Sequence, residues 1–243
     1  MNSKGSDVSR DITVSVVSHR QNALVNQLLA DLARVCPERV TLVITENVPD
    51  ETELVVTLPA ERIVNSEVKG FGANHNAAFK YCSTRYFCVA NPDIRLPADP
   101  FPRLVESLEH AAVAGPLVRS PDGKVEDSAR RFPTAGSLLK KLVVERRSPD
   151  YPVGAGPQHV DWLAGMFILF RREAFEAVGG FDEAYFLYYE DVDICRRLQR
   201  RRGSRAIFDP RAEVVHDARR ASRRDLRLAR HHAASLLRFL SGR

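Results

Sequence analysis

The fold is decided by one long stretch, residues 162–198, which reads WLAGMFILFRREAFEAVGGFDEAYFLYYEDVDICRRL. Its apolar run WLAGMFILF leads into RREAFEAV, where apolar residues recur at helical spacing until Gly179 and Gly180 end the helix. The acids Glu190, Asp191 and Asp193 then follow a group of aromatic residues and open a second helix, which becomes basic. Paired carboxylates therefore lie beside an apolar wall, a setting that suits proton transfer as well as helix capping.

The segments before this stretch alternate between strand and helix signals. Runs rich in β-branched and apolar residues predict strands at 12–17, 40–45, 53–58, 62–65 and 86–90. Apolar residues at helical spacing predict helices at 24–35 and 102–111, and a glycine-bearing turn opens another helix within 70–82. A polar segment, 119–157, has little periodicity and predicts a loop. The alternation predicts an α/β fold with a mostly parallel central sheet flanked by helices.

Composition favours a single domain. The chain has 243 residues, of which 44% are hydrophobic, so it can bury a core of ordinary size. Its longest apolar run is far short of the ~20 residues that a membrane span needs, so neither a span nor a secretion signal is expected. Cys36, Cys82, Cys88 and Cys195 show no metal-binding spacing, which predicts buried free thiols and favours a reducing cytoplasm.

Polar residues follow three of the predicted strands. They are Ser18-His19, Glu46-Asn47 and Asn91-Pro92-Asp93. In open parallel sheets ligands bind beyond the carboxyl ends of the strands, so this edge is the expected ligand site.

Asp93 has two readings. An Asp in an Asn-Pro-Asp tripeptide often only forms the turn, but a carboxylate at a sheet edge also suits Mg²⁺ or Mn²⁺. His216 follows a strand-like run and is either a surface or core histidine or, paired with Asp93, part of a metal site.

The glycines near residue 72 do not complete a dinucleotide-binding motif. His75 stands where the third glycine is required, which argues against a Rossmann dehydrogenase. Gly72 allows backbone to approach a ligand, and Asn74 or Asn76 then supplies an amide; the alternative is that these residues only start a helix.

The acids 190, 191 and 193 also have two readings. In the first turn of a helix they stabilise the helix dipole. Glu190 and Asp191 are adjacent and follow aromatic residues, however, so desolvation and mutual repulsion raise a carboxylate pKa and make a better general base.

Taken together, these segments resemble family-2 inverting glycosyltransferases of the GT-A fold, especially their bacterial rhamnosyltransferase-like branch. The matching pieces are VSVVSH, GFGANHNAAF, VANPDIRL, SARRFPT, residues 162–198 and VVH, in the family's order. The resemblance implies a domain over 1–216, with a nucleotide-sugar donor bound by about 1–100 and an acceptor by about 101–216. It also implies Asp93 and His216 as ligands of Mg²⁺ or Mn²⁺, Asp191 as catalytic base and Glu190 as its neighbour that helps place the acceptor.

The resemblance extends to other site residues. The expected donor-binding residues are Ser18, His19, Glu46, Asn47, Gly72, Asn76, Asn91 and Asp93. The expected acceptor-binding residues are Trp162, Gly165, Tyr189 and Glu190. Two departures matter: many relatives have Asp-x-Asp in place of Asn91-Pro92-Asp93, which predicts weaker metal binding, and an Asp-Asn pair in place of Glu46-Asn47, which changes base recognition.

Two basic features remain. Arg130 and Arg131 either bind phosphate of the donor or acceptor, or are a solvated pair. The net charge is +5, and residues 217–243 hold eight arginines and two aspartates. Within that segment, residues 223–240 form a predicted amphipathic helix with Leu226, Ala229, Ala233, Leu236, Leu237 and Leu240 on one face. It either lies on an anionic membrane surface or packs on the domain.

The leading hypothesis is an enzyme that moves a sugar, with L-rhamnose as the sugar suggested by the resemblance, to a glycan or polyprenyl-diphosphate-linked acceptor. It would work in the cytoplasm or at the inner face of the cell membrane, in surface polysaccharide synthesis. The alternative is an inactive glycosyltransferase-like scaffold, against which the retention of Asp93, Asp191 and His216 argues. Nucleic-acid binding is not expected, because the basic tail offers only Phe239 for stacking on bases.

Overall fold

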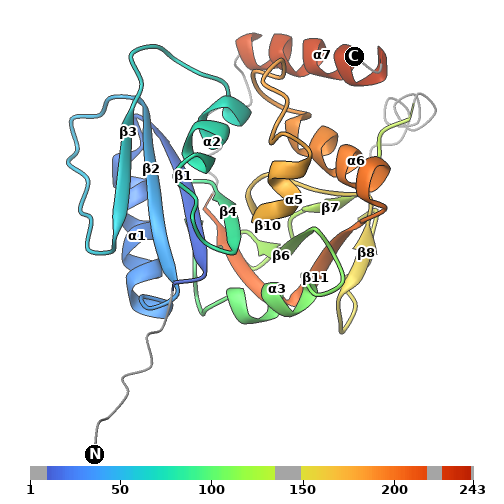
Figure 1. Ribbon diagram of the computed structural model, residues 1–243, viewed down its shortest axis with the longest axis horizontal. Helices are drawn as coiled ribbons and strands as arrows, with labels where there is room; N and C mark the ends of the chain where they lie inside the picture. Colours follow the sequence, from blue (N-terminus) through green and yellow to red (C-terminus); the bar gives the residue numbers. More distant parts are fainter. Residues whose placement is uncertain (1–9, 135–148, 218–225, 242–243) are drawn as a thin grey trace, which may run out of the picture.

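The computed structural model describes residues 10–134, 149–217 and 226–241 (Figure 1). The strands are β1 (Ile12–His19), β2 (Val40–Val48), β3 (Ala60–Val64), β4 (Tyr86–Ala90), β5 (Ile94–Arg95), β6 (Val113–Arg119), β7 (Ala129–Arg130), β8 (Gln158–Val160), β9 (Trp162–Leu163), β10 (Phe167–Arg171) and β11 (Ala206–His216). The helices are α1 (Asn22–Val35), α2 (Phe71–Phe79), α3 (Phe101–Ser107), α5 (Arg172–Ala177), α6 (Glu190–Arg202) and α7 (Leu226–Ser241).

One central sheet runs through the molecule in the order β3-β2-β1-β4-β10-β6-β11-β5, with β8 paired to β11. The pairs β3–β2, β2–β1, β1–β4 and β6–β11 are parallel. Strand β10 is antiparallel to both β4 and β6, so it joins the two parallel parts into a mixed sheet. The predicted α/β fold is confirmed, with the parallel arrangement strongest in the N-terminal half.

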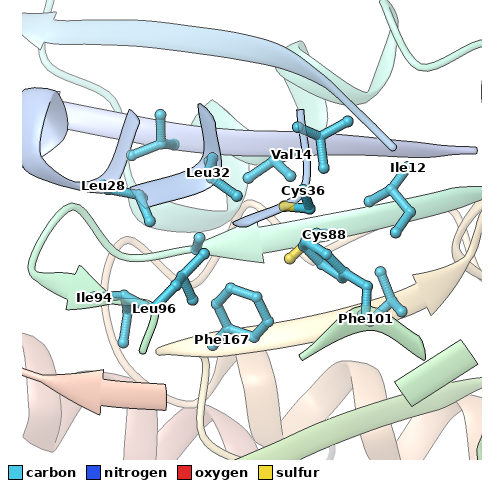
Figure 2. Close-up of a cluster of buried hydrophobic side chains, with 14 of the residues drawn as sticks. Ile12, Val14, Leu28, Leu32, Cys36, Cys88, Ile94, Leu96, Phe101 and Phe167 are labelled. Carbon is cyan, nitrogen blue, oxygen red and sulfur yellow. The ribbon is translucent and has the colours of Figure 1, made fainter. Parts of the chain in front are cut away.

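The core lies on both faces of this sheet, because alternate residues of each strand point to opposite sides. On β4, Cys88 packs with β1 and helices α1 and α3, whereas Phe87 packs with α2, α5 and α6 on the other face. Figure 2 shows the first cluster, in which Val14 of β1 lies near Leu32 of α1. All four cysteines are buried free thiols, as predicted.

The strand ends meet at one edge, as expected. Ser18 of β1 pairs with Glu46 of β2, and Val16 pairs with Ala90 at the end of β4. Glu46 and Asn47 lie within β2, however, and not in a loop after it, because the strand continues to Val48.

Other sequence predictions need correction. Residues 53–58 do not form a strand, because side chains of α1 bond the backbone of this region: Asn26 Nδ2 donates to the Glu53 carbonyl and Asn26 Oδ1 accepts from the Val55 N–H, each at 2.8 Å. Helix α3 ends at Ser107, earlier than predicted. Part of the predicted loop 119–157, residues 135–148, lies outside the described residues. None of the helices in the described part of the chain has the length and apolar character to cross a membrane.

Two glycines let α2 lie against residues 181–186. A Cβ on Gly72 would lie 2.7 Å from Cβ of Phe181, and one on Gly70 would lie 2.5 Å from the Phe186 carbonyl oxygen. His75 of the same helix is buried next to Ser15, with 2.8 Å between its Nδ1 and the hydroxyl. Burial lowers the pKa of His75 to about 3, so it is a neutral core residue.

Replacing Gly72 with alanine therefore tests this packing. Alanine normally stabilises a helix by about 0.5–1 kcal/mol relative to glycine. Here the contact with Phe181 should outweigh that gain and destabilise the protein by about 1–3 kcal/mol, measured by urea unfolding. Gly154→Ala is the control, since a Cβ there meets nothing within 4 Å. Equal stability of the two variants would contradict the packing argument.

Candidate active site

The turn at residues 164–166, between β9 and β10, connects three distant segments through its own backbone. The Ala164 N–H donates to the Ser128 carbonyl at 2.8 Å, and the Met166 carbonyl accepts from the Asn91 N–H at 2.8 Å. Between them, the Gly165 N–H donates to Oδ2 of Asp191 at 2.9 Å. The segment after β4, the segment around β7 and the start of α6 are thus brought to one place.

Asp93 and His216 are brought together by the pairing of β5 with β11. Nε2 of His216 lies 3.3 Å from Oδ2 of Asp93, and its Nδ1 lies 2.8 Å from Oε2 of Glu126. Burial alone would lower the pKa of His216, but the bonds to the two carboxylates outweigh burial and raise that pKa to about 9. Glu126 was missed in the sequence because it stands in the segment without periodicity and belongs to no motif.

These residues fit a divalent cation with few protein ligands. Oδ1 of Asp93 is buried and has no hydrogen-bond partner among the described residues, so one carboxylate oxygen is left for a ligand. Carboxylate oxygen and neutral imidazole nitrogen are both donors that Mn²⁺ accepts, so a cation bound by His216 would displace the proton from its Nε2. No group of three or more His, Cys, Asp or Glu side chains in the described part of the chain forms a ready metal site. A bound cation would therefore take its remaining ligands from water and substrate phosphate.

Glu190 and Asp191 open α6 in two different environments. Oδ2 of Asp191 accepts the Gly165 N–H, and its Oδ1 accepts the Val192 N–H at 2.8 Å. Burial raises the pKa of Asp191, and these N–H groups and the charge of Arg130 offset part of that rise. Glu190 is only 4% exposed, and its Oε2 has no partner among the described residues. Burial, and then the charge of Asp191, raise the pKa of Glu190 to about 8.

The third acid of this helix turn has a structural role. Asp193 is buried and accepts from Nε of Arg197 at 2.6 Å, with Arg196 at 3.6 Å. Asp193 therefore stabilises its own helix through (i, i+4) and (i, i+3) pairs.

An aromatic and basic group surrounds Asp191. The guanidinium of Arg130 lies 5.3 Å from the ring centre of Trp162 and forms an ion pair with Asp127 at 3.0 Å. The Trp162 indole donates to the Arg131 carbonyl at 2.9 Å. Burial raises the pKa of Tyr189; Asp191 raises it further, whereas the nearby charge of Arg130 lowers it.

Arg131 lies on a different side of this loop. Its guanidinium is 5.4 Å from the ring centre of Tyr151, and its backbone N–H donates to Asp150. The structure therefore separates the Arg130 and Arg131 side chains, which the sequence had grouped.

At the predicted donor edge, the polar side chains are tied to one another. The Ser18 hydroxyl bonds Asn22 Oδ1, and Asn22 Nδ2 donates to Oε1 of Glu46 at 3.1 Å. Oε2 of Glu46 accepts from Nε of Arg62 at 2.7 Å, so this carboxylate is held on both sides. His19 is exposed, with Nδ1 3.4 Å from Nδ2 of Asn47.

A second asparagine network orders the start of α2. Oδ1 of Asn47 accepts from Asn65 Nδ2 at 2.9 Å and from the Lys69 N–H at 2.8 Å. Asn65 also donates to Asn74, which in turn donates to the Gly70 carbonyl at 2.9 Å. Asn74 therefore orders the start of α2, the second of the two roles that the sequence left open.

Asn76 joins α2 to residue 181. Its amide donates to the Phe181 carbonyl and accepts from the Phe181 N–H, each at 2.9 Å. Gly72 packs on the same residue. Gly72 and Asn76, which the sequence predicts to bind the donor, thus both contact Phe181. Their role in donor binding stays a prediction.

Comparisons with known proteins agree with this architecture. The family model described as "Glycosyltransferase like family 2" matches residues 9–233. The N-acetylglucosaminyl-diphospho-decaprenol L-rhamnosyltransferase of Mycobacterium tuberculosis is 36% identical over 172 residues, which are 64% of this chain and 54% of that protein. This chain thus spans about half of that relative's length. Rhamnosyltransferase WbbL of Escherichia coli K12 is 28% identical over 95% of this chain and 92% of its own length.

Solved structures show the same fold at low identity. Mannosyltransferase PcManGT from Pyrobaculum calidifontis, in complex with GDP-Man and Mn²⁺, has a TM-score of 0.63 at 16% identity and covers 96% of this chain and 66% of its own. GalNAc-T7 with UDP, GalNAc and Mn²⁺ has a TM-score of 0.64 at 14% identity and covers 86% of this chain and 44% of its own. The fold is therefore of the GT-A type, and the match over residues 9–233 shows that this chain belongs to glycosyltransferase family 2.

Proposed function

We propose that this chain transfers a sugar, L-rhamnose, with inversion, from a nucleotide-diphosphate donor to a glycan or polyprenyl-diphosphate-linked acceptor. The reaction would belong to bacterial surface polysaccharide synthesis. Two relatives named as rhamnosyltransferases support the sugar, and the name of one includes a diphospho-decaprenol acceptor. The observation that carries the proposal is the hydrogen bond from Gly165 to Asp191 at the turn that also binds the segment leading to Asp93.

Asp191 is the proposed base. Burial raises its pKa, so its carboxylate is a stronger base than an exposed one, while two backbone N–H groups fix its orientation. It takes the proton of the acceptor hydroxyl as the hydroxyl oxygen bonds to the anomeric carbon. The bond from that carbon to the diphosphate oxygen breaks on the opposite face, and the nucleoside diphosphate leaves with the electron pair. Inversion at the anomeric carbon follows from this geometry.

Glu190 is proposed to place the acceptor. With a pKa of about 8 it is mostly protonated near neutral pH, so it offers a hydroxyl donor as well as a carbonyl acceptor. Trp162, Gly165 and Tyr189 complete the proposed acceptor side. The indole and phenol rings supply apolar surface, and Arg130, which lies over Trp162, is proposed to bind phosphate.

Asp93 and His216 are proposed to hold Mg²⁺ or Mn²⁺, which would offset the charge on the departing diphosphate. Ser18, His19, Glu46, Asn47, Gly72, Asn76 and Asn91 form the proposed donor side, within residues 1–100. Residues 101–216 would form the acceptor part. A polyprenyl-linked acceptor resides in a membrane, so we place the enzyme in the cytoplasm at the inner face of the cell membrane.

The proposal is tested by nucleotide binding. Nucleoside diphosphates and nucleotide sugars, added with Mn²⁺ or Mg²⁺, should raise the melting temperature, since a ligand at 100 times its Kd stabilises the fold by about 2.7 kcal/mol. Removal of the metal with a chelator should abolish most of the shift. A protein that none of the nucleotides stabilises in the presence of metal would not be a nucleotide-sugar enzyme.

Asp191→Asn should remove the base and leave binding in place. We expect kcat to fall by about 10²–10⁴-fold while the nucleotide-induced shift in melting temperature is retained. Asp193→Asn, in the same helix turn, is the control. It should lower stability with little change in kcat, because the Asp193 carboxylate forms an ion pair with Arg197. Equal losses of kcat in the two variants would favour a role in helix stability for both.

Glu126 should strengthen metal binding by orienting the His216 ring. Its bond to Nδ1 fixes the ring so that Nε2 points toward Asp93, and loss of such a partner typically weakens metal binding by about 10–100-fold. We expect Glu126→Ala to weaken Mn²⁺ binding in the presence of a nucleoside diphosphate, measured by electron paramagnetic resonance. Glu126→Gln, which can still accept from Nδ1, should lose less. Glu213→Gln, which breaks only an ion pair with Arg119, is the control, and unchanged Mn²⁺ affinity in Glu126→Ala would contradict the role.

A further inference from the structure

Helix α7 is held to the protein by a face that is not its predicted apolar face. Phe239 is buried against the guanidinium of Arg196, 3.9 Å from its ring centre, and the Ser235 hydroxyl donates to the Leu187 carbonyl at 2.9 Å. Arg238 forms an ion pair with Asp182 at 2.9 Å. These contacts come from one side of the helix, so they fix which side faces outward.

Three of the predicted apolar residues, Ala233, Leu237 and Leu240, lie on that outward side, whereas Leu236 is half-buried. Leu237 is 69% exposed and Leu240 is 46% exposed, and Ala233 one turn earlier is exposed as well. The side chains of residues 223–229, including Leu226 and Ala229, lie outside the described residues. The two sequence alternatives are therefore not exclusive: the helix packs on the domain and still presents apolar side chains to the outside. Figure 1 shows α7 on the outside of the molecule, beyond α2 and α6.

The positive charge of α7 indicates which kind of partner its outward face binds. Arg230 is exposed on the same helix, and residues 217–243 contain eight arginines against two aspartates. A second copy of so basic a segment would be repelled, whereas an anionic lipid surface attracts it by about 1 kcal/mol for each arginine near the surface. Exposed leucines beside arginines on a helix are the pattern of an interfacial membrane helix.

The inner face of α7 contacts the residues just before the acid pair. The His231 ring stacks on Phe186 with 4.7 Å between ring centres, and Phe239 lies 5.7 Å from Tyr189. Tyr188 and Tyr189 have left-handed backbone, with φ of 71° and 69°. A surface bound to the outside of α7 would thus lie one helix away from Glu190.

We propose that the outward face of α7, formed by Arg230, Ala233, Leu237 and Leu240, docks on an anionic membrane surface. In that position it presents the segment at 186–191 to a lipid-linked acceptor. The acceptor part of this inference rests on the proposed function, whereas the docking itself does not.

The test is co-sedimentation with lipid vesicles. The protein should bind vesicles of phosphatidylcholine with phosphatidylglycerol, bind pure phosphatidylcholine weakly, and dissociate as salt is raised. The double variant Leu237→Gln, Leu240→Gln should bind anionic vesicles at least about 10-fold more weakly. Val55→Gln, Val56→Gln is the matched control, since these valines are 62% and 42% exposed in the loop before β3, and it should bind as the original protein does.

Two results would overturn the docking proposal. One is unchanged vesicle binding by the Leu237, Leu240 variant. The other is a dimer of the original protein, measured by analytical ultracentrifugation, that this variant abolishes, because the face would then be a contact between copies. The assay contains no substrate, so its failure leaves the transfer reaction untouched. Once sugar transfer by the original protein is measured, the Leu237, Leu240 variant should retain transfer to a short water-soluble acceptor. It should lose transfer to a polyprenyl acceptor in anionic vesicles.

Discussion

The site depends on three hydrogen bonds made by the backbone of one turn, Ala164, Gly165 and Met166. They join the segment just before β7, the first turn of α6 and the segment after β4, which are far apart in the chain. Backbone groups carry this connection, so it survives most side-chain changes in the turn. Gly165 is the exception, because a Cβ there would lie 3.3 Å from the Phe71 ring and 3.7 Å from Cβ of Asp191. The turn therefore sets how close α2 and α6 approach each other and where the Asp191 carboxylate lies.

The residues before α6 are held in an unfavourable state by their surroundings. Left-handed backbone costs roughly 1–2 kcal/mol for a residue other than glycine, and Tyr188 and Tyr189 both have it. Glu190 next to them is buried with one carboxylate oxygen unpartnered among the described residues, which costs further free energy. Ring contacts of Tyr189 with α7 and the Asp193–Arg197 pair within α6 offset part of the cost. Strain concentrated in this way is typical of functional sites, since only surrounding structure can maintain it.

Much of the fold could be predicted because its signals are local. Runs rich in β-branched and apolar residues placed β1 and β4, helical spacing placed α1, and the acid pair marked the start of α6. The errors came from long-range contacts. Residues 53–58 read as a strand, but Asn22 and Asn26 of α1 bond the carbonyls of Thr52 and Glu53. Glu126 has no motif around it, and only its contact with His216 indicates a role for its carboxylate. The leucines of α7 suggested a packed or membrane-facing stripe, and only the contacts of Ser235, Arg238 and Phe239 show which way it faces.

Arg130 connects the electrostatics of the site with its proposed substrate. Burial raises the pKa of Asp191, and the nearby guanidinium of Arg130 is among the groups that hold this rise back. A phosphate bound to Arg130 would neutralise that charge and add negative charge nearby, and both effects raise the pKa of a carboxylate further. Under the proposed mechanism, Asp191 would therefore become a stronger base when an acceptor diphosphate is in place. Glu190 would stay protonated under the same change, because added negative charge raises its pKa too. The adjacent acids would then keep separate roles, one as proton acceptor and one as hydrogen-bond donor, through the binding of the substrate.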